Sequence, residues 1–483
     1  MKIKLGKEEY HLLYNTDSDD VTCKAFLADA VIDADDVTKA DLKHAYGHAD
    51  RYHTQFCWME TYEPMYDDEG DLLCYQCGCP VQGEQTAGSD YHIWRDGVFE
   101  SAGAHQSITC LGTFYLEDGE GNRLSVITCT DDFLLKETAG NDKKLTMRVL
   151  GAFAKAMGGW EKVIYEDRPT SFKGYGIAWS RDNTVVTLHM TSHIESLAHT
   201  WVPEVFQDKT PEGVLSGSKL LHAADSLRLE DPRPHVLSKQ AKESQMMWGG
   251  IKYVERAVMP RVSRLMHKGS CCQSAPPPEA HTVARSVIVI MYQHRMEGIT
   301  FGGSKLGRRV LLHGGMLCDL KLEDGAPIEV EGMADTTTGE CPIYAYAVTY
   351  NGGVIAHAVK KIDGLVPNSC LSECKGSTRV SETLLLARDA LAALGRPQHE
   401  PSVIGTDNSA NLAIAMGTAT PARAKHDLVK WASLKERIRA KYIWLTKVAT
   451  AVMPVDFMTK WLKKEKMEAQ LAYIINSRHA VWP

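Results

Sequence analysis

The chain has 483 residues, of which 44% are hydrophobic and 24% are charged, a composition typical of folded globular proteins and not of disordered chains. Its length allows two to four domains, each with its own core. The formal net charge of −7 excludes the overall basic character of most nucleic-acid-binding proteins, so any binding of nucleic acid would depend on local sites.

We find no targeting motif in the sequence. No apolar run reaches membrane-spanning length, and the first residues, MKIKLGKEEYHLLYN, lack the apolar centre of a signal peptide. Thirteen cysteines, an odd number spread over the whole chain, indicate reduced thiols and not a disulfide framework. We therefore expect an intracellular protein, cytoplasmic or nuclear, with no membrane partner; the sequence does not predict the oligomeric state.

The first 205 residues alternate short β-like runs with polar turns. Two hairpins are predicted, one with its turn at Gly119–Asn122 and one with its turn near Asp182 and Asn183. Between them, residues 143–160 have apolar residues at helical spacing and end in Gly-Gly. The order of hairpin, helix and hairpin predicts an α+β layer, with helices on one face of an antiparallel sheet.

Residues 206–325 are predicted to be mostly helical, and from residue 326 strands and helices alternate. The helical segments are 217–229, 246–268 and 280–296, the last two separated by a loop with a proline run. Asn351-Gly352 joins two predicted strands, and a helix is expected to begin at Ser381 and to end at Gly395. Residues 326–475 therefore predict a third, α/β domain.

Four acidic residues of this last part follow strands or begin helices. Asp335 follows an alternating apolar run, Asp407 ends the strand SVIGT, Glu382 falls in the first helical turn, and Asp456 begins a helix after Pro454. Strand C-termini and helix N-termini converge at one edge of an α/β sheet, where carboxylates could hold divalent metals. Each residue could equally be an ordinary turn or cap residue, and spacing alone leaves both interpretations open.

The segment RLSVITCTDDFLLKE, residues 123–137, poses the same question. Asp131 and Asp132 repel each other at the centre of an otherwise strand-like pattern, so either they form a solvated hairpin turn or they hold a metal ion.

The C-terminal part resembles the ribonuclease H domain of copia-type retrotransposon polyproteins. The resemblance rests on Asp407-Asn408 before an Ala-rich helix, on Lys425-His426, and on Asp-x-x-Thr-Lys at residues 456–460. It implies that Asp335, Glu382, Asp407 and Asp456 are catalytic, metal-binding carboxylates, with Glu373 as the alternative to Glu382. It also implies that His426 contacts substrate or supports the site.

Upstream, the sequence resembles the reverse transcriptase of the same elements. Cys129-Thr130-Asp131-Asp132 is similar to the family's Tyr-x-Asp-Asp hairpin, and residues 38–50 resemble the segment that supplies a further catalytic Asp, here Asp41. The resemblance implies that Asp41 and Asp131 bind metal, that Asp132 supports them, and that Tyr46 excludes the ribose 2′-hydroxyl. Template and nucleotide contacts are implied for three residues: Gly83, Gln85 and Ala87.

The resemblance implies a polymerase palm at residues 1–205, a helical thumb and connection at 206–325 and a ribonuclease H-like domain at 326–475. Two Mg²⁺ ions, or Mn²⁺, are implied for each active site, with an RNA template, a DNA primer, deoxynucleoside triphosphates and an RNA–DNA hybrid as partners. The chain departs from the family at Cys129 and in the 40 residues before Asp41, which do not resemble the fingers region. We therefore expect an impaired polymerase site and a surviving ribonuclease H.

Two alternatives belong to other functional classes. An inactive retroelement relic could persist as a nucleic-acid- or protein-binding module. Cys57, Cys74, Cys77 and Cys79, together with three histidines (His44, His48 and His53), could instead bind zinc, although the Cys-x-Cys spacing is poor for a zinc knuckle.

Overall fold

In the computed structural model, the chain folds into two compact units, which are described separately. Unit 1 comprises Met1–Asp19, Asp35–Pro169 and Ala393–Gly395, and unit 2 comprises Asp20–Ala34, Thr170–Ala392 and Arg396–Pro483. The structure describes residues 17–49, 56–57, 75–76, 87–228, 237–303, 308–313, 316–321, 329–338, 341–363, 366, 368–420 and 428–482. The divisions predicted after residues 205 and 325 do not coincide with the borders of these units.

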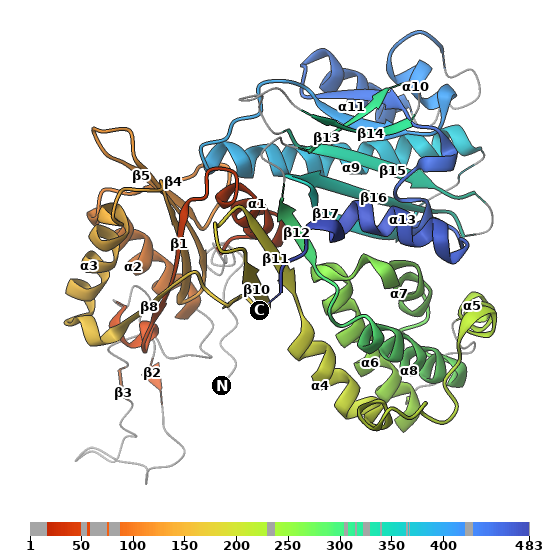
Figure 1. The fold of residues 1–483 in the computed structure, drawn as a ribbon, viewed down its shortest axis with the longest axis horizontal. Helices are drawn as coiled ribbons and strands as arrows, with labels where there is room; N and C mark the ends of the chain where they lie inside the picture. The colour runs from red at the N-terminus through yellow and green to blue at the C-terminus, as the bar shows by residue number, and fades with distance from the viewer. Residues whose placement is uncertain are drawn as a thin grey trace, which may run out of the picture. The chain divides into compact units, whose positions relative to one another are not determined.

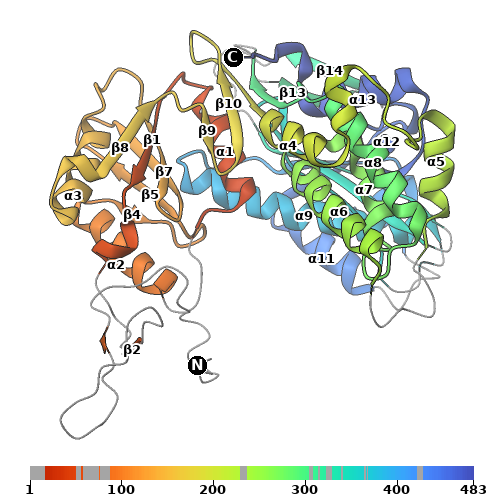
Figure 2. The same ribbon diagram turned by 90° about the horizontal axis from the view of Figure 1, so that it is seen from below.

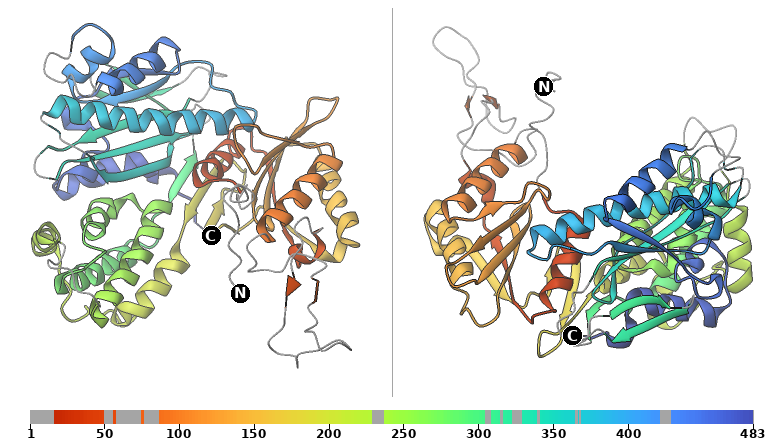
Figure 3. Two further views of the ribbon diagram at one scale, coloured as in Figure 1. Left: turned by 180° about the vertical axis from the view of Figure 1, so that it is seen from behind. Right: turned by 90° about the horizontal axis from the view of Figure 1, so that it is seen from above.

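Unit 1 is built around a six-stranded antiparallel sheet of order β4-β5-β6-β7-β1-β8. Helices α2 and α3 cover one face of this sheet (Figures 1 and 3). Its elements are β1 (Asp36–Leu42), η2 (Ala45–His48), β2 (Phe56–Cys57), β3 (Tyr75–Gln76), α2 (Ala87–Ser101), β4 (His105–Gln106), β5 (Thr113–Glu117), β6 (Arg123–Cys129), β7 (Asp132–Glu137), α3 (Lys144–Met157), η3 (Trp160–Lys162) and β8 (Val163–Asp167).

The core of unit 1 lies between this sheet and its two helices. Helix α3 buries a stripe of apolar side chains at helical spacing and ends at Gly158, whose φ of 84° suits a residue without a Cβ atom. The rings of Phe99 and Phe114 stack at 4.2 Å, and Phe133 and Phe153 pack around them. The predicted α+β layer of antiparallel strands and helices is therefore present in this unit.

Unit 2 begins with α1 (Asp20–Ala30) and a four-stranded antiparallel sheet of order β12-β11-β10-β9. Its helices α6, α7 and α8 lie side by side, and α4 and α5 pack against α8 (Figure 2). The elements of this part are β9 (Ser171–Phe172), β10 (Tyr175–Trp179), β11 (Val185–His189), α4 (Thr191–Trp201), η4 (Pro203–Gln207), α5 (Gly217–Ser226), α6 (Lys239–Val258), η5 (Pro260–Val262), α7 (Ser263–Ser270), α8 (Pro278–Gln293) and β12 (Ile299–Gly302).

The rest of unit 2 is an α/β layer around a five-stranded mixed sheet of order β17-β16-β15-β18-β19, and a separate pair of strands, β13 and β14. The long helix α9 runs along this sheet (Figure 1). The elements are β13 (Arg308–His313), β14 (Met316–Lys321), β15 (Glu331–Thr336), β16 (Ile343–Tyr350), β17 (Gly353–Lys361), α9 (Ser369–Ala393), β18 (Ser402–Thr406), α10 (Ser409–Ala415), α11 (Leu428–Arg439), β19 (Ile443–Lys447), η7 (Thr450–Val452), α12 (Asp456–Thr459), α13 (Lys464–Ile475) and η8 (Ser477–His479).

The predicted turns and most predicted helices of the described chain are confirmed. The hairpin at Asn351-Gly352 joins β16 to β17, and both turn residues have positive φ, 46° and 89°. The predicted helix start at Ser381 is wrong, because α9 begins at Ser369, twelve residues earlier. No helix in the described part of the chain combines the length and apolarity that a membrane crossing requires.

Candidate active site

Asp335 and Asp407 lie at the same edge of the mixed sheet of unit 2. Strands β15 and β18 are adjacent and parallel, with Gly332 opposite Ile404 and Met333 opposite Gly405. Because parallel strands end at the same edge, Asp335 near the end of β15 and Asp407 just after β18 come together there. The predicted convergence of these two strand ends is therefore found in the structure.

The third carboxylate at this edge is Glu373 of α9. One ligand atom from each of Asp335, Glu373 and Asp407 lies within 4.8 Å of the others, and the first two side chains are buried. Helix α9 can approach the sheet this closely because Gly376 has no side chain: a Cβ atom there would lie 2.9 Å from Cγ2 of Thr336. The first turns of α9 therefore deliver Glu373 to the strand ends.

Two threonines hold the carboxylate of Glu373 in place. The Thr336 hydroxyl donates to Oε1 of Glu373 at 2.7 Å, and the Thr406 hydroxyl donates to Oε2 at 3.3 Å. These threonines are the sequence neighbours of the two aspartates, one on β15 and one on β18. Sequence reasoning did not identify them, although an Asp-Thr and a Thr-Asp pair at two strand ends could have indicated them.

Burial and nearby negative charge make Glu373 and Asp335 reluctant to ionise. Burial, followed by the charge of Asp335, raises the pKa of Glu373 to about 8. Burial also raises the pKa of Asp335 to about 6, although the Lys460 ammonium and the Thr459 hydroxyl oppose the shift. Three oxygen ligands that repel one another fit a hard divalent cation such as Mg²⁺ or Mn²⁺.

The fourth predicted carboxylate, Asp456, is neutralised by two lysines. Lys460 Nζ lies 2.5 Å from one of its oxygens, and Lys466 Nζ lies 2.7 Å from the other. Lys460 Nζ is also 3.4 Å from Asp335, whose same oxygen accepts a hydrogen bond from Thr459. The ammonium of Lys460 therefore bridges Asp335 and Asp456.

Partial burial opposes the charge of Lys460, but the carboxylates around it dominate and raise its pKa. Asp407 has further contacts: the Thr450 hydroxyl donates to its carboxylate at 3.0 Å, and Lys447 Nζ donates to its backbone carbonyl.

Glu382, named by the resemblance, does not join this group. It lies nine residues after Glu373 on α9, about 13 Å along the axis and on the opposite face of the helix. Its carboxylate is exposed and pairs with Arg379 at 2.7 Å. The structure instead brings in the alternative residue, Glu373. His426 lies outside the described residues.

In unit 1 the structure brings Asp41, Asp131 and Asp132 to neighbouring backbone positions. Asp41 is opposite Asp132 in the β1–β7 ladder, and the Leu42 N–H donates to the Asp131 carbonyl at 3.2 Å. Burial, followed by repulsion from nearby aspartates, raises the pKa of Asp131. Lys39 pairs with Asp132 at 3.2 Å. In the part of the chain that the structure describes, these residues do not form a three-ligand group like that of unit 2.

Asp17, which sequence reasoning missed, holds the turn that carries this aspartate pair. Its carboxylate accepts from the N–H of Thr130 at 2.8 Å and from Arg95 at 3.1 Å. Thr130 needs this support because its φ of 55° is unfavourable for a β-branched residue. The ring of Tyr46 packs against that of Tyr91 at a tilt of 36°, with 5.0 Å between the ring centroids. Burial, followed by the charge of Asp131, raises the pKa of Tyr46.

Two of the three remaining predicted contacts of unit 1 cannot be placed. Gly83 and Gln85 lie outside the described residues, while Ala87 is the buried first residue of α2. Of the possible zinc ligands, Cys74, Cys77, Cys79 and His53 also lie outside the described residues, as does the side chain of Cys57.

Comparison with known proteins gives structural neighbours only. No family profile and no curated protein matches the sequence. The chain is similar to a foamy viral protease-reverse transcriptase in complex with an RNA/DNA hybrid, with 10% identity, a TM-score of 0.39 and 86% of this chain covered. This chain spans 44% of that one.

A second neighbour is the N-terminal RNase H domain of a Mycobacterium tuberculosis protein, solved as a fusion with maltose binding protein. The identity is 14% and the TM-score 0.20, over 30% of this chain and 96% of that one. Both TM-scores are too low for either structural similarity to support a function. The functional interpretation therefore rests on the geometry of the carboxylates.

Proposed function

We propose that unit 2 is a metal-dependent ribonuclease H that cleaves the RNA strand of an RNA–DNA hybrid. The observation that carries the proposal is the group formed by Asp335, Glu373 and Asp407, with ligand atoms within 4.8 Å of one another at a sheet edge. The resemblance to copia-type retrotransposon polyproteins gives the substrate class. A protein of this kind recognises a hybrid mainly through its backbone shape and 2′-hydroxyls.

Each residue has a distinct role in this proposal. When bound, a divalent ion would make a water nucleophilic and stabilise charge on the phosphodiester. Asp335, Glu373 and Asp407 would hold it, and Glu373 must lose its proton to do so. Thr336 and Thr406 keep the Glu373 carboxylate aimed at the group. Lys460 offsets charge on the Asp335 and Asp456 side.

The test is cleavage of a labelled RNA–DNA hybrid by the purified chain in Mg²⁺ or Mn²⁺. We expect Asp335→Asn, Glu373→Gln and Asp407→Asn to lose at least about 100-fold in rate, as expected for loss of a metal ligand. Glu382→Gln is the matched control on the same helix and should keep parental activity. Absence of cleavage by the folded parent, or loss of activity in Glu382→Gln, would overturn the proposal.

We propose further that unit 1 derives from the polymerase palm of the same retroelement polyprotein. Its pairing of Asp41 with Asp132 across β1 and β7 supports this origin. Its natural partners would then be an RNA template, a DNA primer and deoxynucleoside triphosphates. We expect no primer extension in Mg²⁺ and at most weak extension in Mn²⁺. Extension at rates typical of polymerases, lost in Asp131→Asn, would contradict the impairment.

A second candidate function is a catalytically inactive relic that binds nucleic acid or protein. The two lysines that occupy both oxygens of Asp456 favour this alternative, because they remove one carboxylate from metal binding. Binding of the hybrid by the parent without cleavage, in either metal, would support it.

A further inference from the structure

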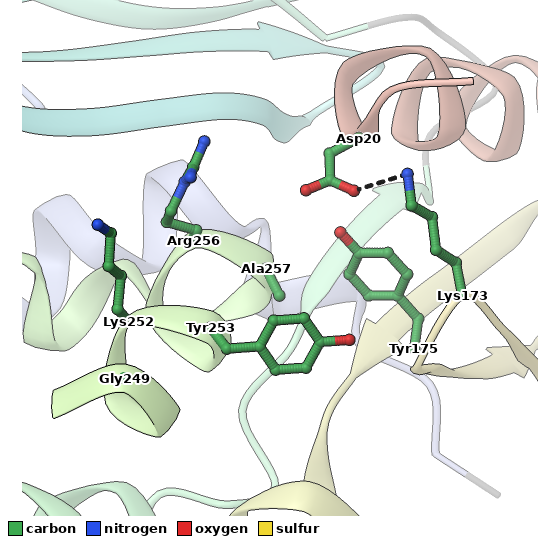
Figure 4. A pocket seen from close by; sticks show the side chains of 8 residues that line it. All are labelled: Asp20, Lys173, Tyr175, Gly249, Lys252, Tyr253, Arg256 and Ala257. Atoms are coloured by element: carbon green, nitrogen blue, oxygen red, sulfur yellow. Dashed lines mark ion pairs between the residues drawn. The ribbon is translucent and has the colours of Figure 1, made fainter. Parts of the chain in front are cut away.

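Unit 2 contains a second polar site, separate from its carboxylates. A cavity of about 310 Å³ lies between the start of α1, the turn joining β9 to β10, and the last turns of α6 (Figure 4). This volume is at the lower end of the range of small-molecule sites, which suits a ligand of mononucleotide size.

The cavity carries an excess of positive charge. Lys252 and Arg256 are exposed and one turn apart on α6, and neither pairs with a carboxylate in the part of the chain that the structure describes. Two like charges at this spacing repel each other mildly, so an anion between them would be favourable. Among the described residues that line the cavity, the carboxylate is that of Asp20, which pairs with Lys173 at 3.3 Å (Figure 4).

Two tyrosines give the cavity aromatic walls. Tyr175 is buried, and its pKa is well above the ordinary value because of burial and the neighbouring Asp20 carboxylate, to which its hydroxyl is hydrogen-bonded. Tyr253 also lines the cavity, and its side chain is 48% exposed. Aromatic rings beside cationic groups are the combination that binds a base together with its phosphate.

The backbone around the cavity leaves room for the Tyr253 side chain. Lys173 and Gly174 both have positive φ, 50° and 82°, which makes the β9–β10 turn tight. A Cβ atom on Gly174 would collide with the hydroxyl of Tyr253. The Nζ of the buried Lys24 donates a hydrogen bond to the backbone carbonyl of Arg256 at 3.2 Å, which supports the last turn of α6. The turn beside Tyr253 is therefore tight, and the backbone of α6 is supported at Arg256.

We propose that this cavity is a metal-independent binding site for a free nucleoside phosphate, with the phosphate on Lys252 and Arg256 and the base against Tyr253. The site is independent of the carboxylate group and of the proposed nuclease activity. It needs no Mg²⁺, because the positive charge comes from side chains.

The test is isothermal titration of the full chain with AMP, inorganic phosphate and adenosine in EDTA, which removes metal-dependent binding at the carboxylates. We expect AMP to bind more tightly than either fragment. The double variant Lys252→Ala/Arg256→Ala should weaken AMP binding at least about tenfold, from loss of charge-assisted hydrogen bonds. Lys242→Ala, an exposed lysine elsewhere on α6, should leave binding unchanged.

Tyr253→Ala separates the aromatic contribution from the charge. It should weaken AMP binding and leave phosphate binding unchanged. Asp335→Asn should leave AMP binding intact even if it abolishes nuclease activity, so the two proposals fail independently. Three results would overturn the site: no heat with AMP, equal affinity for AMP and phosphate, or binding of a single-stranded oligonucleotide without binding of AMP.

Discussion

Replacing Glu373 by Gln should stabilise unit 2 in the absence of metal while abolishing its metal binding. Glu373 is 3% exposed, and its pKa rises from 4.5 to about 8 on folding. At about 1.4 kcal/mol for each pH unit, keeping this carboxylate ionised costs about 5 kcal/mol at and above pH 8. Gln occupies the same space without the charge: its amide oxygen can still accept from the Thr336 hydroxyl, and its amide NH2 can donate to the Thr406 hydroxyl oxygen.

The sign of the pH dependence follows from the raised pKa. Between pH 4.5 and about 8 the folded protein keeps a proton on Glu373 that the unfolded chain has lost, so stability falls as the pH rises. The stabilising effect of Glu373→Gln should therefore be near zero at pH 4.5 and largest at pH 8. Because Asp335 titrates in the same group, the full 5 kcal/mol is an upper value.

The measurement is urea unfolding of parent and variant in EDTA at pH 5, 6.5 and 8, followed by tryptophan fluorescence. Seven of the ten tryptophans belong to unit 2, so this signal reports mainly its transition. Mg²⁺ at pH 8 should then stabilise the parent and not the variant. A variant no more stable than the parent at pH 8, or a difference independent of pH, would refute the reasoning.

Three further changes test other parts of unit 2. In Asp456→Asn, Mg²⁺ should still give most of the thermal stabilisation that it gives the parent, measured by calorimetry, because Lys460 and Lys466 already occupy the oxygens of Asp456. Complete loss of this stabilisation in the variant would show that Asp456 is a metal ligand. Arg261→Met should lower the free energy of unfolding by about 1–3 kcal/mol, because Arg261 joins the partly exposed Glu297 and Glu468. No measurable loss in urea unfolding would contradict this. Gly376→Val should reduce hybrid cleavage by moving α9 away from Thr336; unchanged cleavage would show that the approach of α9 is not critical.

The sequence predicted the elements whose signals are local. The turn at Asn351-Gly352 is specified by residues that tolerate positive φ, and α3 by apolar side chains that recur at helical spacing. Asp335 and Asp407 were identified for a related reason: each stands where a short apolar strand ends, and the parallel pairing of β15 and β18 brings those ends together.

The start of α9 could not be predicted from local signals. Residues 369–378, SCLSECKGST, are rich in small and polar residues of low helical propensity, so the apolar periodicity of the helix becomes clear only later. In the structure this segment is helical and mostly buried, with polar residues such as Ser372 and Ser377 as deeply buried as Leu371. Tertiary packing therefore stabilises the helix in this segment. Because the predicted helix began at Ser381, Glu382 fell in its first turn and became the candidate in place of Glu373.

Contacts between residues distant in the sequence also explain why Asp335, Glu373 and Asp407 form one group while Asp456 pairs with lysines. Lys460 is four residues from Asp456, a pairing that helical spacing could have indicated, but its second partner, Asp335, is 125 residues away in the sequence. The ammonium of Lys460 lies between Asp335 and Asp456 and offsets the repulsion between these two carboxylates. The repulsion among Asp335, Glu373 and Asp407 is not offset in this way. Burial, and after it this repulsion, raises the pKa values of Asp335 and Glu373, and a divalent cation gains most by binding where the repulsion persists.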